Sequence, residues 1–175
     1  FCPEIQSCKG FQQIKKNALT LIFFTLLLPG FKQLLIKMSS EKIIAAWKKK
    51  QFKPVYWLEG EEDYYIDQVV DYAEHKILSE ADAGFNLTVF YGKDANWADI
   101  INACRRYPMF AERQVVLLKE AQQMREIEKL EPYIDNPLSS TVLVVSYKEK
   151  KVDGRTLLAK TLKKKAEVFT TKKMY

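Results

Sequence analysis

The sequence predicts an α/β domain in which five strands form one mostly parallel sheet with helices on both faces. Strand-like and helix-like segments alternate five times after residue 50, which is the order that builds a parallel sheet. Two strand-like segments, Val115–Leu118 and Thr141–Val145, are continuously apolar, as expected of strands covered on both sides. A third, Val55–Leu58, runs through a glycine into an amphipathic helix pattern. At 175 residues the chain is long enough for one such core and too short for a second full domain.

The first elements are a helix, a strand and a second helix. Ser39-Ser40-Glu41 is a favourable helix start, so we expect a short helix over Ser40–Lys50. The strand Val55–Leu58 follows and ends at Gly60. The next helix carries apolar residues at helical spacing on one face, at Ile66, Val69, Val70, Ala73 and Ile77.

The middle of the chain is expected to hold a loop, a strand and a helix. Ala81–Gly84 is interpreted as a loop, and Leu87–Tyr91 alternates like a strand. Asn96 is a favourable N-cap for the following helix. Pro108 should end that helix near Tyr107, because the residue before a proline avoids helical geometry.

The last third continues the alternation of helices and strands. After the strand Val115–Leu118 we expect, in order, the helix Ala121–Leu130, the strand Thr141–Val145, the charged loop Lys148–Gly154, the helix Thr156–Lys165 and the strand Glu167–Thr170.

Residues 1–37 differ in composition from the rest. Their apolar run, Ala18–Leu28, is too short to cross a bilayer, which needs about 20 residues. A basic flank and an apolar run fit a signal peptide, but no small-residue cleavage pattern follows. Because Met38 directly precedes a favourable helix start, it is a plausible native initiator. We therefore expect residues 1–37 to be an upstream, leader or vector-derived segment outside the fold, and residues 38–175 to form the domain.

The cysteines and the single histidine suggest no reactive or metal site. Cys2, Cys8 and Cys104 lack metal-ligand spacing, so we expect a reducing, cytoplasmic compartment and no bound metal. Cys104 falls on the apolar face of its helix and is interpreted as a small core residue. His75 lies among charged residues and is interpreted as solvated.

The segment Pro54–Ala73 has the strand–turn–helix order of a phosphate-binding loop, G-x-x-x-x-G-K-[ST]. Counting from Gly60, Tyr65 stands at the second glycine, Ile66 at the lysine and Asp67 at the hydroxyl position. Carboxylates fill the turn between them. A triphosphate would meet negative charge there instead of a lysine, so the turn predicts no nucleotide binding.

The other catalytic positions of such an ATPase are also changed. Lys119 ends the third strand where an aspartate would hold Mg²⁺, and Glu120 alone is a poor magnesium site. Ser146 ends the next strand and has no phosphate to sense. Without a second histidine or a Cys/His pair there is no nucleophile–base arrangement to propose. We expect no catalytic residue, no cofactor and no enzyme activity in this domain itself.

Three segments in order resemble a known family. They are PVYWLEGEEDYYIDQ, then FNLTVFYGKDANWADIINACRRYPMFAERQVVLLKEAQQM, then LSSTVLVVSYKEKKVDGRTLLAKTLKKKAEV. Together they look like the N-terminal domain of the delta subunit of the bacterial clamp loader, a part of DNA polymerase III holoenzyme. The resemblance covers roughly Ile43 to Phe169.

This resemblance implies an AAA+-like (RecA-type) domain with a degenerate P-loop that acts in DNA replication. In that family the domain binds the ring-shaped sliding clamp, the beta subunit, and helps to open it for loading onto primed DNA without itself binding ATP. The lid and collar domains that join the other loader subunits are missing from this sequence, so it resembles a fragment or isolated domain. No membrane partner is implied.

The expected clamp-binding element is Tyr107-Pro108-Met109-Phe110. Pro108 ends a helix, so the residues after it should lie on a surface turn before the next strand. By resemblance, Met109 and Phe110 match two adjacent hydrophobic residues that bind the clamp. Arg105 stands where clamp-binding motifs often carry glutamine. The alternative is that one or both hydrophobic side chains pack over the sheet as part of the core.

Two other functions fit parts of the sequence. The alternation of strands and helices fits an active P-loop ATPase as a fold, although the residues oppose that activity. The second alternative is a basic nucleic-acid-binding domain, because residues 148–175 carry ten basic and three acidic residues. Its candidate residues are Lys148, Lys150, Lys151, Arg155, Lys160, Lys163, Lys164 and Lys165. The last four also form one helix face, which could equally be solvated, meet a neighbouring subunit or lie near DNA.

Overall fold

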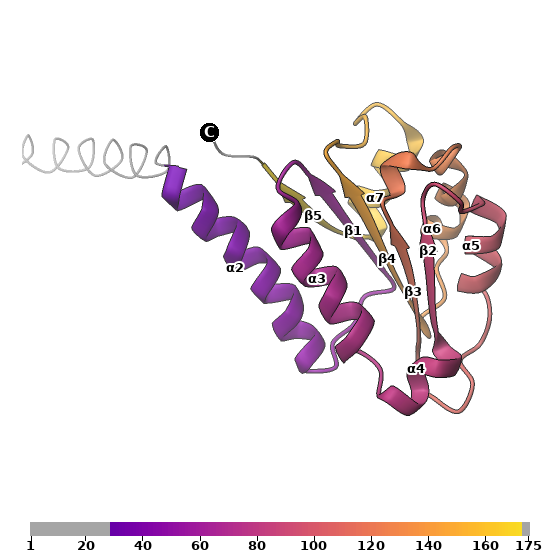
Figure 1. Cartoon of the computed structure of the whole chain (residues 1–175). Coiled ribbons are helices and arrows are strands. Elements are labelled where there is room, and N and C mark those ends of the chain that lie inside the picture. Colours follow the sequence, from indigo (N-terminus) through magenta and orange to yellow (C-terminus); the bar gives the residue numbers. More distant parts are fainter. Residues whose placement is uncertain (1–28, 173–175) are drawn as a thin grey trace, which may run out of the picture. The chain divides into compact units, whose positions relative to one another are not determined.

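Five parallel strands form the sheet in the order β2-β3-β4-β1-β5, within a computed structural model that describes residues 29–172 (Figure 1). The strands are β1 (Val55–Gly60), β2 (Leu87–Tyr91), β3 (Gln114–Lys119), β4 (Thr141–Lys148) and β5 (Glu167–Thr171). Every neighbouring pair is parallel, with Val55 opposite Leu143 and Leu87 opposite Val115. All five strands were predicted, and the sheet is parallel throughout.

Helices cover both faces of the sheet, as predicted. The helices are α2 (Pro29–Lys48), α3 (Asp63–Lys76), α4 (Glu80–Asn86), α5 (Trp97–Cys104), α6 (Glu131–Asp135) and α7 (Leu157–Lys165), with two 3₁₀ helices, η1 (Ala121–Gln123) and η2 (Ile127–Leu130). Side chains alternate along β1, so Trp57 packs with α5, α6 and α7 while Leu58 packs with α3 on the opposite face. Figure 1 shows α3 on one side of the sheet and α5, α6 and α7 on the other.

Several predicted element boundaries were wrong. Helix α2 begins at Pro29 and runs through Ser40, so the serines do not cap its start. The predicted loop Ala81–Gly84 lies inside α4, which Ser79 caps by accepting a hydrogen bond from the backbone N–H of Asp82 at 3.2 Å. Helix α5 ends at Cys104, three residues before Tyr107.

The helix predicted over Ala121–Leu130 is absent from its place, which holds the two 3₁₀ helices instead. Glu120 and Glu126 have φ angles of 53° and 57°, in the left-handed region. A single left-handed residue interrupts a right-handed helix, so each glutamate separates the short helix that follows it from the segment before it. The apolar residues Met124, Ile127 and Leu130 are nevertheless buried.

The proposed division at Met38 remains a prediction, since residues 1–28 lie outside the part that the structure describes. Among residues 29–172, no helix has the length and apolar character needed to span a membrane.

Candidate protein-binding turn and the P-loop position

The turn after β1 is closed by strand β5. Gly60 has a φ angle of 136°, and a Cβ atom there would lie 2.2 Å from the backbone oxygen of Thr171. The backbone N–H of Glu62 donates a hydrogen bond of 3.1 Å to Oγ1 of Thr171, whose side chain is buried. The glycine is therefore required by the close approach of β5. One backbone N–H that a phosphate-binding loop would offer to a ligand is instead used inside the protein.

The residues at the remaining P-loop positions face the core or pair with other residues. Tyr65 and Ile66 are buried against the sheet. Asp67 is exposed, and its Oδ1 lies 2.6 Å from Nζ of Lys148, the last residue of β4. The lysine position thus supplies a core side chain, and the hydroxyl position supplies a carboxylate that is already paired.

The strand ends on the same edge carry a second ion pair. Nζ of Lys119 lies 2.6 Å from Oε2 of Glu74 on α3, and 5.8 Å from the centre of the Tyr91 ring. Glu120 follows Lys119 and accepts a hydrogen bond of 2.7 Å from Nε2 of Gln123. Ser146 is buried beneath them.

These residues line a small cavity of about 200 Å³, together with Asp67, Asp71 and Lys148. The structure therefore brings together Asp67, Lys119, Glu120 and Ser146, as the strand order predicts. Within residues 29–172 no group of three His, Cys, Asp or Glu side chains could hold a metal ion. The arrangement offers ion pairs between helix and sheet where a nucleotide would need free donors.

The predicted partner-binding turn lies at the opposite end of the strands, between α5 and β3. Tyr107, Met109 and Phe110 are 77%, 54% and 94% exposed. The alternative, in which Met109 and Phe110 pack into the core, is therefore wrong. Phe110 also has a φ angle of 57°, which is unfavourable for an aromatic residue.

Two buried amide side chains hold this turn, and the sequence analysis missed both. Gln114, at the start of β3, donates from Nε2 to the backbone oxygens of Ala103 at 3.1 Å and Cys104 at 3.3 Å. These bonds satisfy two carbonyl groups at the end of α5, which ends at Cys104, before Pro108. Asn86, at the end of α4, bonds both the N–H and the C=O of Met109.

A signal for these two residues existed in the sequence. Each is an amide residue directly before a predicted strand, Asn86 before Leu87–Tyr91 and Gln114 before Val115–Leu118. Arg105 is exposed at the end of α5, and the neighbouring Arg106 donates from Nη2 to Oγ1 of Thr88 at 3.2 Å. Arg105 thus lies beside the turn, as predicted, on its solvent side.

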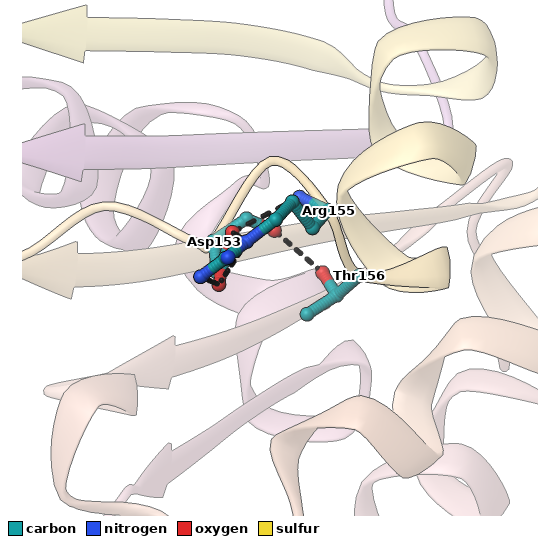
Figure 2. A network of polar contacts seen from close by, with 3 residues as sticks. All are labelled: Asp153, Arg155 and Thr156. Atoms are coloured by element: carbon teal, nitrogen blue, oxygen red, sulfur yellow. Dashed lines mark hydrogen bonds and ion pairs between the residues drawn. The ribbon is translucent and has the colours of Figure 1, made fainter.

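The basic residues of the last third are not equivalent. Lys160, Lys163, Lys164 and Lys165 are exposed on α7, whose Leu158 and Leu162 pack inward. Arg155 is instead paired with Asp153, as Figure 2 shows, through its Nε at 3.2 Å and its Nη2 at 2.9 Å. These hydrogen bonds lower the pKa of Asp153 below its ordinary value. With Lys148 paired to Asp67, the unpaired candidates are concentrated on α7.

The loop before α7 is also internally bonded. Oγ1 of Thr156 donates to the backbone oxygen of Asp153 at 2.8 Å (Figure 2) and accepts from the N–H of Ala159 at 3.2 Å. The Thr156 side chain is thus the N-cap of α7, which fixes where the lysine-bearing helix begins.

Cys104 is a core residue, as predicted. It is the last residue of α5 and is fully buried, and burial raises the pKa of its thiol to about 12. A thiol that stays protonated is neither a nucleophile nor a metal ligand near neutral pH.

Comparisons with known proteins identify relatives for most of this domain. A family model described as DNA polymerase III, delta subunit, matches residues 56–172. DNA polymerase III subunit delta of Bacillus subtilis is 29% identical over 137 residues, covering 73% of this chain and 40% of the relative. The solved structure of the Bacillus subtilis DNA clamp loader delta protein matches with a TM-score of 0.68 and 27% identity, covering 77% of this chain and 43% of that one. The fold is therefore AAA+-like, as expected, and the chain spans less than half the length of these relatives.

Proposed function

Because the chain belongs to the DNA polymerase III delta subunit family, we propose that it acts in DNA replication and that its domain binds the sliding clamp through residues 107–110. In this proposal the domain helps to open the clamp ring for loading onto DNA and does not bind ATP. The observation that carries it is the exposure of Met109 and Phe110 side by side, with Phe110 94% exposed.

Exposing this pair is unfavourable in the free domain. Burying a Met or Phe side chain is worth about 1.5–3 kcal/mol each, and that free energy is not gained while both face water. The left-handed backbone of Phe110 adds a cost of order 1–3 kcal/mol. Both terms support a function for the turn, because an apolar pocket on a partner would recover the burial energy and make the pair a binding hot spot.

Ring opening requires a difference in affinity. A ligand shifts a conformational equilibrium only by the difference between its affinities for the two states. We propose that the turn binds a clamp with a distorted subunit interface more tightly than a closed clamp. The binding free energy of Met109 and Phe110 then does the opening work without nucleotide in this subunit.

The P-loop position supports the absence of ATP from this mechanism. The side chain of Ile66 is buried where a phosphate-binding lysine would reach out, and Lys119 replaces the metal-binding aspartate. Contact with DNA within the complex is a subsidiary proposal, supported by the four exposed lysines of α7.

The test is clamp binding by a Met109→Ala/Phe110→Ala double variant, measured by surface plasmon resonance with the clamp of the same organism. We expect affinity to fall by at least about 100-fold, from the loss of two apolar anchors. The control is Leu157→Ala, since Leu157 is 66% exposed on α7, away from the turn. Thermal melts should show that both variants are folded. An affinity within threefold of wild type for the folded double variant would assign clamp binding to another surface.

A further inference from the structure

We propose that Asn86 is a positioning residue for the clamp-binding turn, whose buried side chain holds the backbone of Met109 and so presents Met109 and Phe110 to the partner. This inference rests on the proposed function, and it adds a residue outside the turn itself.

The contacts of Asn86 are specific to the turn. Nδ2 donates to the backbone oxygen of Met109 at 2.8 Å, and Oδ1 accepts from the backbone N–H of Met109 at 2.6 Å. Nδ2 also donates to the backbone oxygen of Asp82 at 3.1 Å, within α4. Asn86 is 3% exposed. One side chain thus satisfies both backbone groups of Met109, as a neighbouring strand would.

The bonded turn is otherwise irregular backbone. Residues 105–113 form no helix or strand between α5 and β3. Gln114 fixes the end of α5 on one side, and Asn86 fixes Met109 in the middle of the segment. The two hydrogen bonds to Met109 restrict the backbone just before Phe110, whose φ angle of 57° is rarely adopted by an aromatic residue.

Holding the turn should increase affinity by pre-organisation. A segment that is ordered before binding does not lose its conformational entropy on binding. Without Asn86, the turn would sample other conformations, and only the fraction with the bound geometry would be competent. We therefore expect removal of the Asn86 hydrogen bonds to weaken clamp binding about tenfold, although Asn86 need not touch the clamp.

The experiment compares Asn86→Ala and Asn86→Asp in the complete chain, with clamp affinity measured from pH 5.5 to pH 8. Alanine removes all the bonds. Aspartate keeps the acceptor for the Met109 N–H, but at pH 8 it cannot donate and places a carboxylate beside two carbonyl oxygens. As pH falls, the introduced carboxyl gains a proton and can donate again, and burial raises its pKa toward the measured range.

The expected result is about tenfold weaker binding for both variants at pH 8, with recovery at pH 5.5 only for Asn86→Asp relative to wild type at the same pH. Hydrogen exchange of the Met109 amide, compared with wild type at the same pH, should accelerate in Asn86→Ala, and it should change less in Asn86→Asp, which keeps the acceptor for that N–H. If Asn86 served only general stability, the melting temperature would fall but the clamp affinity of Asn86→Asp would not recover at pH 5.5. If Asn86→Ala does not fold, Asn86→Asp, compared with itself across pH, carries the same test.

The possible failures are distinguishable. If the Met109→Ala/Phe110→Ala variant loses clamp binding while both Asn86 variants bind within threefold of wild type, the role of Asn86 is wrong and the proposed function stands. Equal weakening in both Asn86 variants at every pH would also overturn the positioning role. If the double variant binds like wild type, the proposed function itself is wrong.

Discussion

Nζ of Lys119, at the end of β3, lies 2.6 Å from Oε2 of Glu74 on α3. In an active ATPase of this architecture, an acidic residue on that strand would instead hold Mg²⁺. The pair is 23% exposed on each side chain, so it is partly shielded from water. Together with the Lys148–Asp67 pair, it joins helix α3 to the edge of the sheet where a nucleotide would lie. The two lysines at this edge of the sheet, Lys119 and Lys148, are thus paired with carboxylates of α3.

The first prediction is that this domain neither binds nor hydrolyses ATP. Isothermal titration calorimetry with Mg-ATP should give only the heat of dilution, because the phosphate-binding lysine and the metal-binding aspartate are both replaced. Adding ATP should also leave the melting temperature unchanged. Micromolar binding that disappears on substitution within residues 60–67 would contradict this prediction.

The sheet could be predicted because its strands carry a local signal. Continuous apolar runs such as Val115–Leu118 and Thr141–Val145 have few alternatives to burial between two helical layers. The alternation of elements then requires parallel pairing. The turn at residues 107–110 was also correctly predicted to be exposed, because Pro108 cannot continue a helix and loops lie at the surface.

The features that could not be predicted depend on contacts between residues that are distant in sequence. Asn86 and Met109 are 23 residues apart, and their bonds appear only when α4 and the turn meet. The requirement for glycine at position 60 arises from Thr171 on β5, which no local pattern reveals. The predicted helix boundaries were wrong for a related reason. Glu120 and Glu126 adopt left-handed backbone although their residue type does not favour it, so a helical apolar pattern became two 3₁₀ helices.

The second prediction is that clamp binding and any DNA binding use different surfaces of the domain. Replacing the four exposed α7 lysines with glutamine, at Lys160, Lys163, Lys164 and Lys165, should leave clamp affinity within threefold of wild type, because they lie away from residues 107–110. Any DNA affinity of the chain should fall, and its salt dependence should become shallower by about 0.9 in log–log slope for each phosphate that these lysines no longer neutralise. Fluorescence anisotropy with a primed duplex at several salt concentrations measures both. An unchanged slope would show that these lysines do not neutralise DNA phosphates.

The third prediction compares a glycine in close contact with a neighbouring strand, Gly60, with a glycine in open space, Gly84. Gly60→Ala should lower the free energy of unfolding by about 1–3 kcal/mol or more, because the new Cβ would lie 2.2 Å from the Thr171 backbone and the φ angle of 136° is strained for alanine. Gly84→Ala is the matched control, since nothing lies within 4 Å of its Cβ position. Gly84 lies inside α4, so alanine there should be neutral or stabilise by up to about 1 kcal/mol. Thermal melts compare the two. Equal stability of the two variants would mean that β5 does not close the turn.

The fourth prediction is that the domain loses stability at alkaline pH through Cys104. Burial raises the pKa of this thiol from its ordinary value of 9.0 to about 12 in the folded state. Below about pH 9 the thiol is protonated in both states and contributes no pH dependence. Between pH 9 and 12 the unfolded chain releases the proton while the folded domain retains it, so the free energy of unfolding falls as pH rises. The slope is at most about 1.4 kcal/mol per pH unit for one group.

Urea unfolding at pH 8, 9 and 10 measures this slope, in a background where Cys2 and Cys8 are replaced by serine to prevent oxidation. Cys104→Ala should be less stable at pH 8, because it leaves a small cavity, but its stability should fall less steeply above pH 9. Burial also raises the pKa of Tyr133, so part of the alkaline loss should remain in the variant. A slope identical to that of the parent chain would show that Cys104 does not control the alkaline loss of stability.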